Sequence, residues 1–176
     1  MTEYVYYERN MTFFMDLKND KNTILLAIAC IILGMLLMGL IMVLVNIPHK
    51  ETIYTDQAPK PIGPYSQGVA VNDYEYTSGQ IGIDPQTGVL ADTIEDQTHQ
   101  VMKNLRAILA VSGLEFDDVV NTHIYLTNIS DFPTVNAIYS GYMGNETPSR
   151  STVGVASLPK GALVEIEMIA EKSKNL

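Results

Sequence analysis

The chain has 176 residues, a formal net charge of −9 and 47% hydrophobic residues, which suits one globular domain with a segment left over. The charge excess belongs to residues 51–176, which hold 16 acidic and 7 basic residues. Because an acidic domain without a basic cluster repels phosphate backbones, we expect no nucleic acid partner.

The first fifty residues contain a tail and an apolar run. Residues 1–21 are rich in tyrosine and phenylalanine, show no clear period, and are interpreted as a short tail. Residues 24–45 carry no charge. A run of about 22 residues, at about 1.5 Å each, is long enough to cross a hydrocarbon core about 30 Å thick. We therefore predict a single-pass transmembrane helix over residues 22–47, with the membrane as a partner of residues 24–45.

A cleaved signal peptide, a lipoprotein signal and a buried core helix are the alternatives for this run. A signal peptide has a shorter apolar core and a small-residue cleavage site. Cys30 follows small residues as in a lipoprotein signal, but the long apolar stretch beyond it argues against lipidation. A core helix is rarely apolar on every face. Three basic residues precede the span and two follow it, which leaves the side occupied by the domain open.

The remaining sequence predicts strands and helices in alternation. Residues 48–58 are interpreted as a linker to a domain over residues 59–176. Periods of 2 and 3.6 predict, in chain order, strands over 68–72 and 74–83, a helix from about 92 to 112, a strand within 117–127, a helix from about 131, and strands over 149–156 and 162–171. This order predicts an α+β domain with a mixed sheet and both helices on one face.

No pattern in the chain indicates a metal site or a cofactor. His49, His99 and His123 are far apart and lack ligand spacing. The chain also has no glycine-rich phosphate loop. We therefore expect neither a metal nor a cofactor.

Arg150 heads a run of small residues near the C-terminus. Alternation places Arg150 and Thr152 on one face of their strand, and Glu165 and Glu167 on the polar face of theirs. If these strands are neighbours, a guanidinium, a hydroxyl and two carboxylates share one surface. Solvated surface charges give the same pattern. The functional interpretation is that Arg150 grips a carboxylate while a glutamate holds a water.

Five segments resemble the RidA family, also called YjgF, of reactive enamine and imine deaminases. They cover nearly all of residues 54–171 in the family's order and read APKPIGPYSQGV, YTSGQIGIDPQTG, QTHQVMKNLRAILAVSGLEFDDVVNTHIYLTNISDF, VNAIY and PSRSTVGVASLPKGALVEIEMIA. The resemblance does not extend to residues 1–50, because typical members lack a membrane span.

The resemblance implies a homotrimer of chorismate-mutase-like α+β subunits with clefts between neighbouring chains. Arg150 matches the arginine that binds the substrate carboxylate, and Glu165 matches the glutamate associated with the attacking water. The other positions that match or adjoin the cleft are Tyr65, Ser78, Asn136 and Tyr139. Thr152 stands where many members have a cysteine, so thiol-dependent behaviour is not expected, although its backbone groups can still contribute. The loop between Asn136 and Arg150 looks shorter than in familiar members, which puts the substrate preference in doubt.

The function that the resemblance implies is hydrolytic deamination of 2-aminoacrylate-like 2-imino acids to 2-keto acids and ammonia. The predicted span adds a membrane tether to this activity. The alternative is a non-catalytic trimeric module of the same fold that binds a small molecule or serves as a scaffold.

Overall fold

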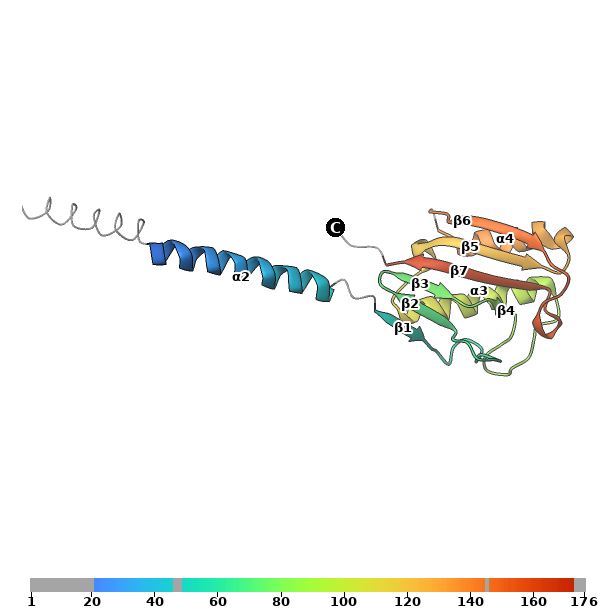
Figure 1. Ribbon diagram of the computed structural model, residues 1–176. Coiled ribbons are helices and arrows are strands. Elements are labelled where there is room, and N and C mark those ends of the chain that lie inside the picture. The colour runs from blue at the N-terminus through green and yellow to red at the C-terminus, as the bar shows by residue number, and fades with distance from the viewer. Residues whose placement is uncertain (1–20, 46–48, 145, 173–176) are drawn as a thin grey trace, which may run out of the picture. The chain divides into compact units, whose positions relative to one another are not determined.

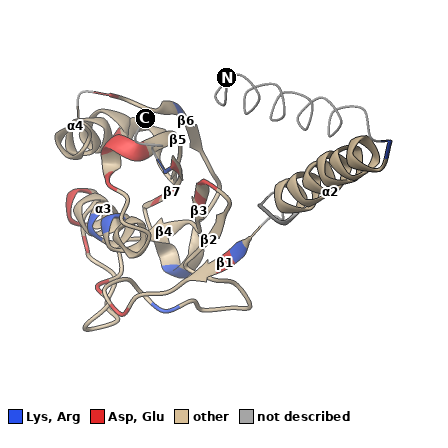
Figure 2. Ribbon diagram, turned by 90° about the vertical axis from the view of Figure 1, so that its left-hand side faces the viewer, with Lys and Arg blue, Asp and Glu red and all other residues tan. Residues whose placement is uncertain are grey.

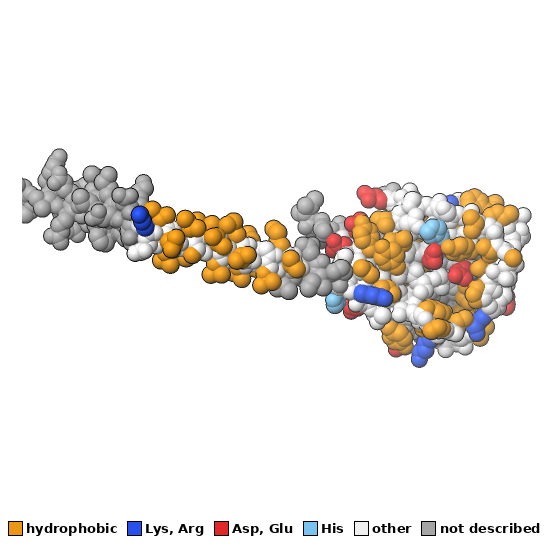
Figure 3. All heavy atoms as spheres, viewed as in Figure 1, with side chains coloured by type: hydrophobic (Ala, Val, Ile, Leu, Met, Phe, Trp, Pro, Cys, Tyr) orange, Lys and Arg blue, Asp and Glu red, His pale blue; other side chains and the backbone are white. Residues whose placement is uncertain are grey.

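The computed structural model describes residues 21–45, 49–144 and 146–172, which divide into two units, one up to residue 47 and one from residue 48 onward. The first unit is helix α2 (Lys21–Val45). Its apolar side chains are exposed from Ile24 to Val43 (Figure 3). After Lys21 it carries no charged residue (Figure 2). By length and composition α2 is sufficient to cross a membrane.

The second unit is built on a seven-stranded mixed sheet (Figure 1). The order across the sheet is β1-β2-β3-β7-β5-β6, and β4 also pairs with β7. Only β5 and β6 run parallel among the described strand pairs. The strands are β1 (Lys50–Ile53), β2 (Gly68–Val71), β3 (Tyr74–Thr77), β4 (Gln80–Ile81), β5 (Val119–Leu126), β6 (Ser149–Gly154) and β7 (Val164–Glu171).

Helices α3 (Ile94–Val111) and α4 (Phe132–Tyr142) cover one face of this sheet (Figure 1). The Thr93 side chain caps α3 by accepting a hydrogen bond of 3.1 Å from the backbone N–H of Asp96. The main core lies between helices and sheet and includes Val101, Leu105 and Ile166, each fully buried. The expected α+β domain, with a mixed sheet and two helices on one face, is confirmed.

Strand β7 shows how the sheet separates its two faces. Its residues alternate strictly between buried and half-buried. The buried residues Val164, Ile166 and Met168 belong to the core under the helices. The half-buried residues, among them Glu165 and Glu167, point to the other side of the sheet, which we call the open face. Figure 3 shows apolar and acidic side chains mixed on this face.

Two of the sequence predictions are corrected by the strands. The expected linker over 48–58 contains β1, which pairs with β2 and buries Ile53. The sequence did not predict this strand, because it is only four residues long and precedes a proline-rich stretch. The predicted strand over 74–83 is broken between β3 and β4, where the register against β7 shifts by one residue and the Met168 N–H donates to the Thr77 side chain instead of to the backbone.

Candidate functional site

Arg150 lies on β6, at the edge of the sheet and on the helix side. Its Nη2 donates a hydrogen bond of 2.8 Å to Asn136 Oδ1 on α4. The guanidinium carbon lies 4.9 Å from the centre of the Tyr139 ring and 5.8 Å from that of Phe132. Among the described residues, no carboxylate lies within ion-pair distance of Arg150. α4 therefore holds the Arg150 guanidinium in place, while most of the N–H donors of the guanidinium stay available to a ligand.

A cavity of about 360 Å³ opens beside the guanidinium. Its walls are Asn136, Tyr139, Ser140, Met143, Gly144, Thr147, Pro148 and Arg150. The Tyr139 hydroxyl lies 3.0 Å from Thr122 Oγ1 in the core below. Burial raises the pKa of Tyr139, although Thr122 and Arg150 act in the opposite direction, so the phenol stays neutral under the cation. The cavity is large enough for a small carboxylic acid held by Arg150.

Thr152 shares the face of Arg150, two residues along β6. Its Oγ1 is buried and has no hydrogen-bond partner among the described residues. A buried hydroxyl without a partner is costly, so a ligand that bonded to it would gain more than it would at an exposed site. Arg150, Asn136 and Tyr139, all expected at the site, therefore line one cavity, and Thr152 lies on the same face of β6. We call these four residues the arginine cluster.

Glu165 belongs to a second cluster, on the open face. Its carboxylate occupies the space where a side chain on Gly79 would lie. Ser78 fixes this backbone, because its Oγ donates a 2.6 Å hydrogen bond to the Ser66 carbonyl. Burial, and then the neighbouring charge of Glu167, raise the pKa of Glu165. A carboxylate with a raised pKa is a better proton acceptor, which is the property that activation of a water requires.

Tyr65 borders the same cluster. Its hydroxyl accepts a hydrogen bond of 3.1 Å from the backbone N–H of Ile62, and its side chain is 48% exposed. Tyr65 and Gly79 line a cavity of about 330 Å³ between the loop before β2 and strand β4. Tyr65, Ser78, Gly79 and Glu165 are called the glutamate cluster below.

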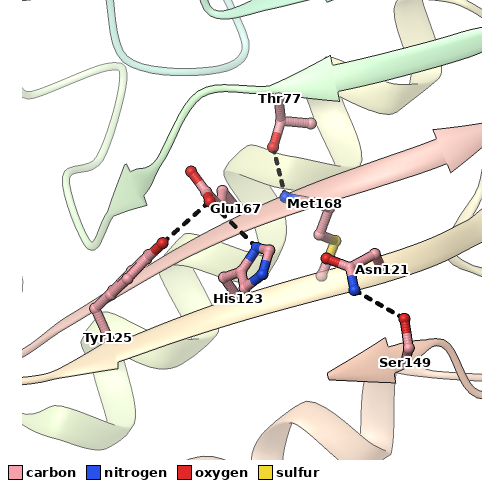
Figure 4. A network of polar contacts seen from close by, with 7 residues as sticks. All are labelled: Thr77, Asn121, His123, Tyr125, Ser149, Glu167 and Met168. Atoms are coloured by element: carbon pink, nitrogen blue, oxygen red, sulfur yellow. Dashed lines mark hydrogen bonds and ion pairs between the residues drawn. The ribbon is translucent and has the colours of Figure 1, made fainter. Parts of the chain in front are cut away.

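Tyr125, His123 and Glu167 form a polar network next to the glutamate cluster (Figure 4). The Tyr125 hydroxyl donates a 3.1 Å hydrogen bond to Glu167 Oε1, and His123 Nδ1 lies 3.3 Å from the same oxygen. Reasoning from the sequence missed Tyr125 and His123. The alternation of the strand VVNTHIYL could have found them, since it places both on one face.

The predicted common surface of Arg150 and Glu165 is wrong for a single chain. β5 lies between β6 and β7, so the two strands are not neighbours. Arg150 is in register with the buried Thr122, whereas Glu165 is in register with Tyr125 on the open face. Alternation correctly grouped the residues that share a face in each strand. The prediction took the face of Arg150 as the one away from the core, whereas Arg150 points to α4 on the helix side.

The comparisons with known proteins concern the second unit. Residues 55–172 match the family model described as Endoribonuclease L-PSP. The chain belongs to this family, the RidA or YjgF family. A RutC family protein of Saccharolobus solfataricus is 51% identical over 125 residues, which are 70% of this chain and 99% of that protein.

Two further relatives connect the RidA family to an activity and to a solved structure. The 2-iminobutanoate/2-iminopropanoate deaminase of Dermatophagoides farinae is 45% identical over 121 residues, which are 68% of this chain and 94% of that protein. The crystal structure of YyfA, a Rid family protein from Yersinia pestis, is 51% identical, covers 70% of this chain and 99% of that one, and has a TM-score of 0.68. The family match begins after α2.

Proposed function

We propose that this RidA family protein is a membrane-tethered hydrolase that converts reactive 2-imino acids and their enamine tautomers to 2-keto acids and ammonia. The observation that carries the proposal is Arg150, whose guanidinium is held by Asn136 beside a cavity and has no ion-pair partner among the described residues. Such a cation suits a small carboxylate. The relative from Dermatophagoides farinae, whose name describes this activity, supports the choice.

The arginine cluster binds and orients the substrate. Arg150 donates two parallel hydrogen bonds to the substrate carboxylate, and Thr152 contributes a further polar contact. Because the carboxylate is adjacent to the imine carbon, fixing one end places the reacting carbon. No cofactor takes part in these steps.

The glutamate cluster supplies the water. Glu165 accepts a proton as the water oxygen bonds to the imine carbon, and the imine nitrogen takes up a proton to give a carbinolamine. When the C–N bond breaks, the amino group takes the proton that Glu165 holds and leaves as ammonia with the electron pair of that bond. The hydroxyl proton returns to solvent, and the oxygen becomes the keto oxygen. One imine and one water thus yield one 2-keto acid and one ammonia.

The site is completed between subunits of a homotrimer. Arg150 and Glu165 lie on opposite faces of the sheet in one chain, so one small substrate must receive them from two chains. The open face suits such an interface, because Tyr74, Tyr76 and Val153 are 40%, 46% and 46% exposed there.

Helix α2 tethers this trimer to a membrane. Four residues separate the end of α2 from the start of β1, so the tether is short. Three such helices must then leave the trimer on the same side. The tether holds the hydrolase at the membrane surface.

The family model's description names an endoribonuclease, which the charge of the domain disfavours. Residues 51–176 carry 16 acidic and 7 basic residues, and binding to phosphate backbones depends on basic ones.

The test generates 2-aminoacrylate in situ with a dehydratase and follows release of the keto acid. Wild-type protein should accelerate release, and Arg150→Ala should reduce kcat/KM by about 100-fold. Arg106→Ala is the matched control, because Arg106 stacks on Phe116 and Tyr142 instead of bordering the arginine cluster. Equal rates with and without wild-type protein would sink the enzyme proposal and leave the binding or scaffold module.

A further inference from the structure

We propose that Glu167, held by Tyr125 and His123, is a positioning residue that controls proton transfer at Glu165. This inference rests on the proposed function and deepens it. Glu167 itself touches neither substrate nor water in the proposed mechanism.

The two glutamates differ in how they are held. Tyr125 and His123 both contact Glu167 Oε1, at 3.1 Å and 3.3 Å, from neighbouring positions of β5 (Figure 4). Glu165 packs on Gly79 but makes no hydrogen bond or ion pair with any described residue. Glu167 is therefore fixed, whereas Glu165 keeps its oxygens free for a water.

The spacing of the two carboxylates couples them. Residues two apart on a strand share a face and lie about 6.6 Å apart at about 3.3 Å per residue. A fixed negative charge at this distance makes a second carboxylate hold a proton more tightly. Because Tyr125 and His123 hold Glu167 in place, the distance between its carboxylate and that of Glu165 varies little, and so does its electrostatic effect on Glu165.

His123 is placed to offset this charge whenever its ring is protonated. A protonated imidazole 3.3 Å from Glu167 Oε1 would offset the negative charge that Glu165 experiences. His123 and Glu167 thus act on Glu165 in opposite directions, which makes their substitutions distinguishable.

Other titratable groups on or beside the open face are farther along the sheet or in its loops. Within the described residues, β7 adds Glu171, β3 adds Tyr74 and Tyr76, and β1 adds Lys50, while β6 presents none there. The loops beside β4 add Lys60, Tyr65, Asp84 and Lys160. Apart from burial, Glu167 is the group that raises the pKa of Glu165.

The experiment measures kcat/KM against pH for a 2-imino acid with an uncharged side chain, using full-length protein in detergent and excess generating enzyme. Loss of activity on the acid side reports protonation of Glu165. Glu167→Gln keeps the size of the side chain and an acceptor for Tyr125 but removes the charge. Its acid limb should move to lower pH by about half a unit, and its plateau should fall several-fold, because the remaining base is weaker.

His123→Gln should move the acid limb to higher pH, since it leaves the Glu167 charge without an offset. Glu171→Gln is the matched control, with the same charge change on the same face of β7, and its limb should stay in place. Unmoved limbs in both Glu167→Gln and His123→Gln would overturn the inference. If Glu167→Gln does not assemble, the half-exposed His123→Gln decides alone. A wild-type protein inactive on every imino acid would instead overturn the proposed function.

Discussion

Arg150 and Glu165 lie on opposite faces of the same sheet, and β5 separates the strands that carry them. The cation belongs to a cluster under the edge of α4, and the carboxylate belongs to a cluster on the open face. The arginine cluster contains a cation but no carboxylate, and the glutamate cluster contains a carboxylate but no cation. The proposed chemistry therefore depends on contact between two chains.

Thr152 provides a test of the arginine cluster. Its buried Oγ1 has no hydrogen-bond partner within the described part of the chain, so Thr152→Val should leave the free energy of unfolding unchanged or raise it by about 1 kcal/mol. The same change should lower kcat/KM about 10-fold if the hydroxyl bonds to substrate. Chemical denaturation and imine hydrolysis give the two values. Thr122→Val is the control: it should lose stability, because Thr122 is the partner of Tyr139. Wild-type activity in Thr152→Val would show that the Thr152 hydroxyl does not bind the substrate.

Gly79 provides a test of the glutamate cluster. A methyl group there would overlap the Glu165 carboxylate, so Gly79→Ala should displace that carboxylate and reduce kcat by about 10-fold or more. Gly141→Ala is a suitable control, because a methyl group at that position of α4 meets no atom within 4 Å. A fully active Gly79→Ala protein with unchanged KM would show that the position of Glu165 is unimportant.

Glu75 should make the domain less stable as the pH rises. It is 1% exposed, and neither carboxylate oxygen has a hydrogen-bond partner among the residues that the structure describes. Burial raises its pKa above the ordinary value, despite the opposing effects of Ser112 and Lys172. The folded protein thus holds this proton more tightly than the unfolded chain. The contribution is complete below the unfolded pKa and is lost as the pH rises through the folded pKa.

Replacing Glu75 by leucine should remove this dependence. Glu75→Leu should stabilise the protein by about 1 kcal/mol or more at pH 8, with a smaller gain at pH 4. Urea unfolding at a series of pH values measures both. Glu51→Leu, at an exposed position of β1, controls for the loss of one charge. An equal gain at pH 4 and pH 8 would argue against a titrating Glu75.

Most of the fold could be predicted from sequence periodicity, whereas the neighbours of each strand could not. Alternation in ALVEIEMIAE assigned the faces of β7 correctly, and the 3.6-residue period located α3. The placement of β5 between β6 and β7 depends on long-range strand pairing, which local sequence patterns do not determine. The same holds for Glu75, whose burial follows from packing against Ala170 and the end of α3 and not from its own strand.

Helix α2 should anchor the full-length protein. Its exposed apolar side chains have no covering protein in the described unit, so the protein should sediment with membranes, resist an alkaline wash and be released by detergent. A fragment of residues 48–176 should remain in solution. Replacing Leu36 and Leu37 by lysine should weaken anchoring, at about 2.5–3.5 kcal/mol for each charge. Release of the unaltered protein by the alkaline wash would contradict a spanning helix.

The most direct test of the shared site mixes two inactive variants. Arg150→Ala and Glu165→Ala chains should each be inactive alone, with Arg106→Ala as an active control. A site between chains takes Arg150 from one chain and Glu165 from the next. When the two variants are co-expressed in equal amounts and assemble at random, about a quarter of the sites should therefore contain both residues and be active. Recovery of imine hydrolysis to about that fraction is the predicted result. Mixed trimers that form, as shown by differently tagged chains purifying together, yet remain inactive would contradict a site built between chains.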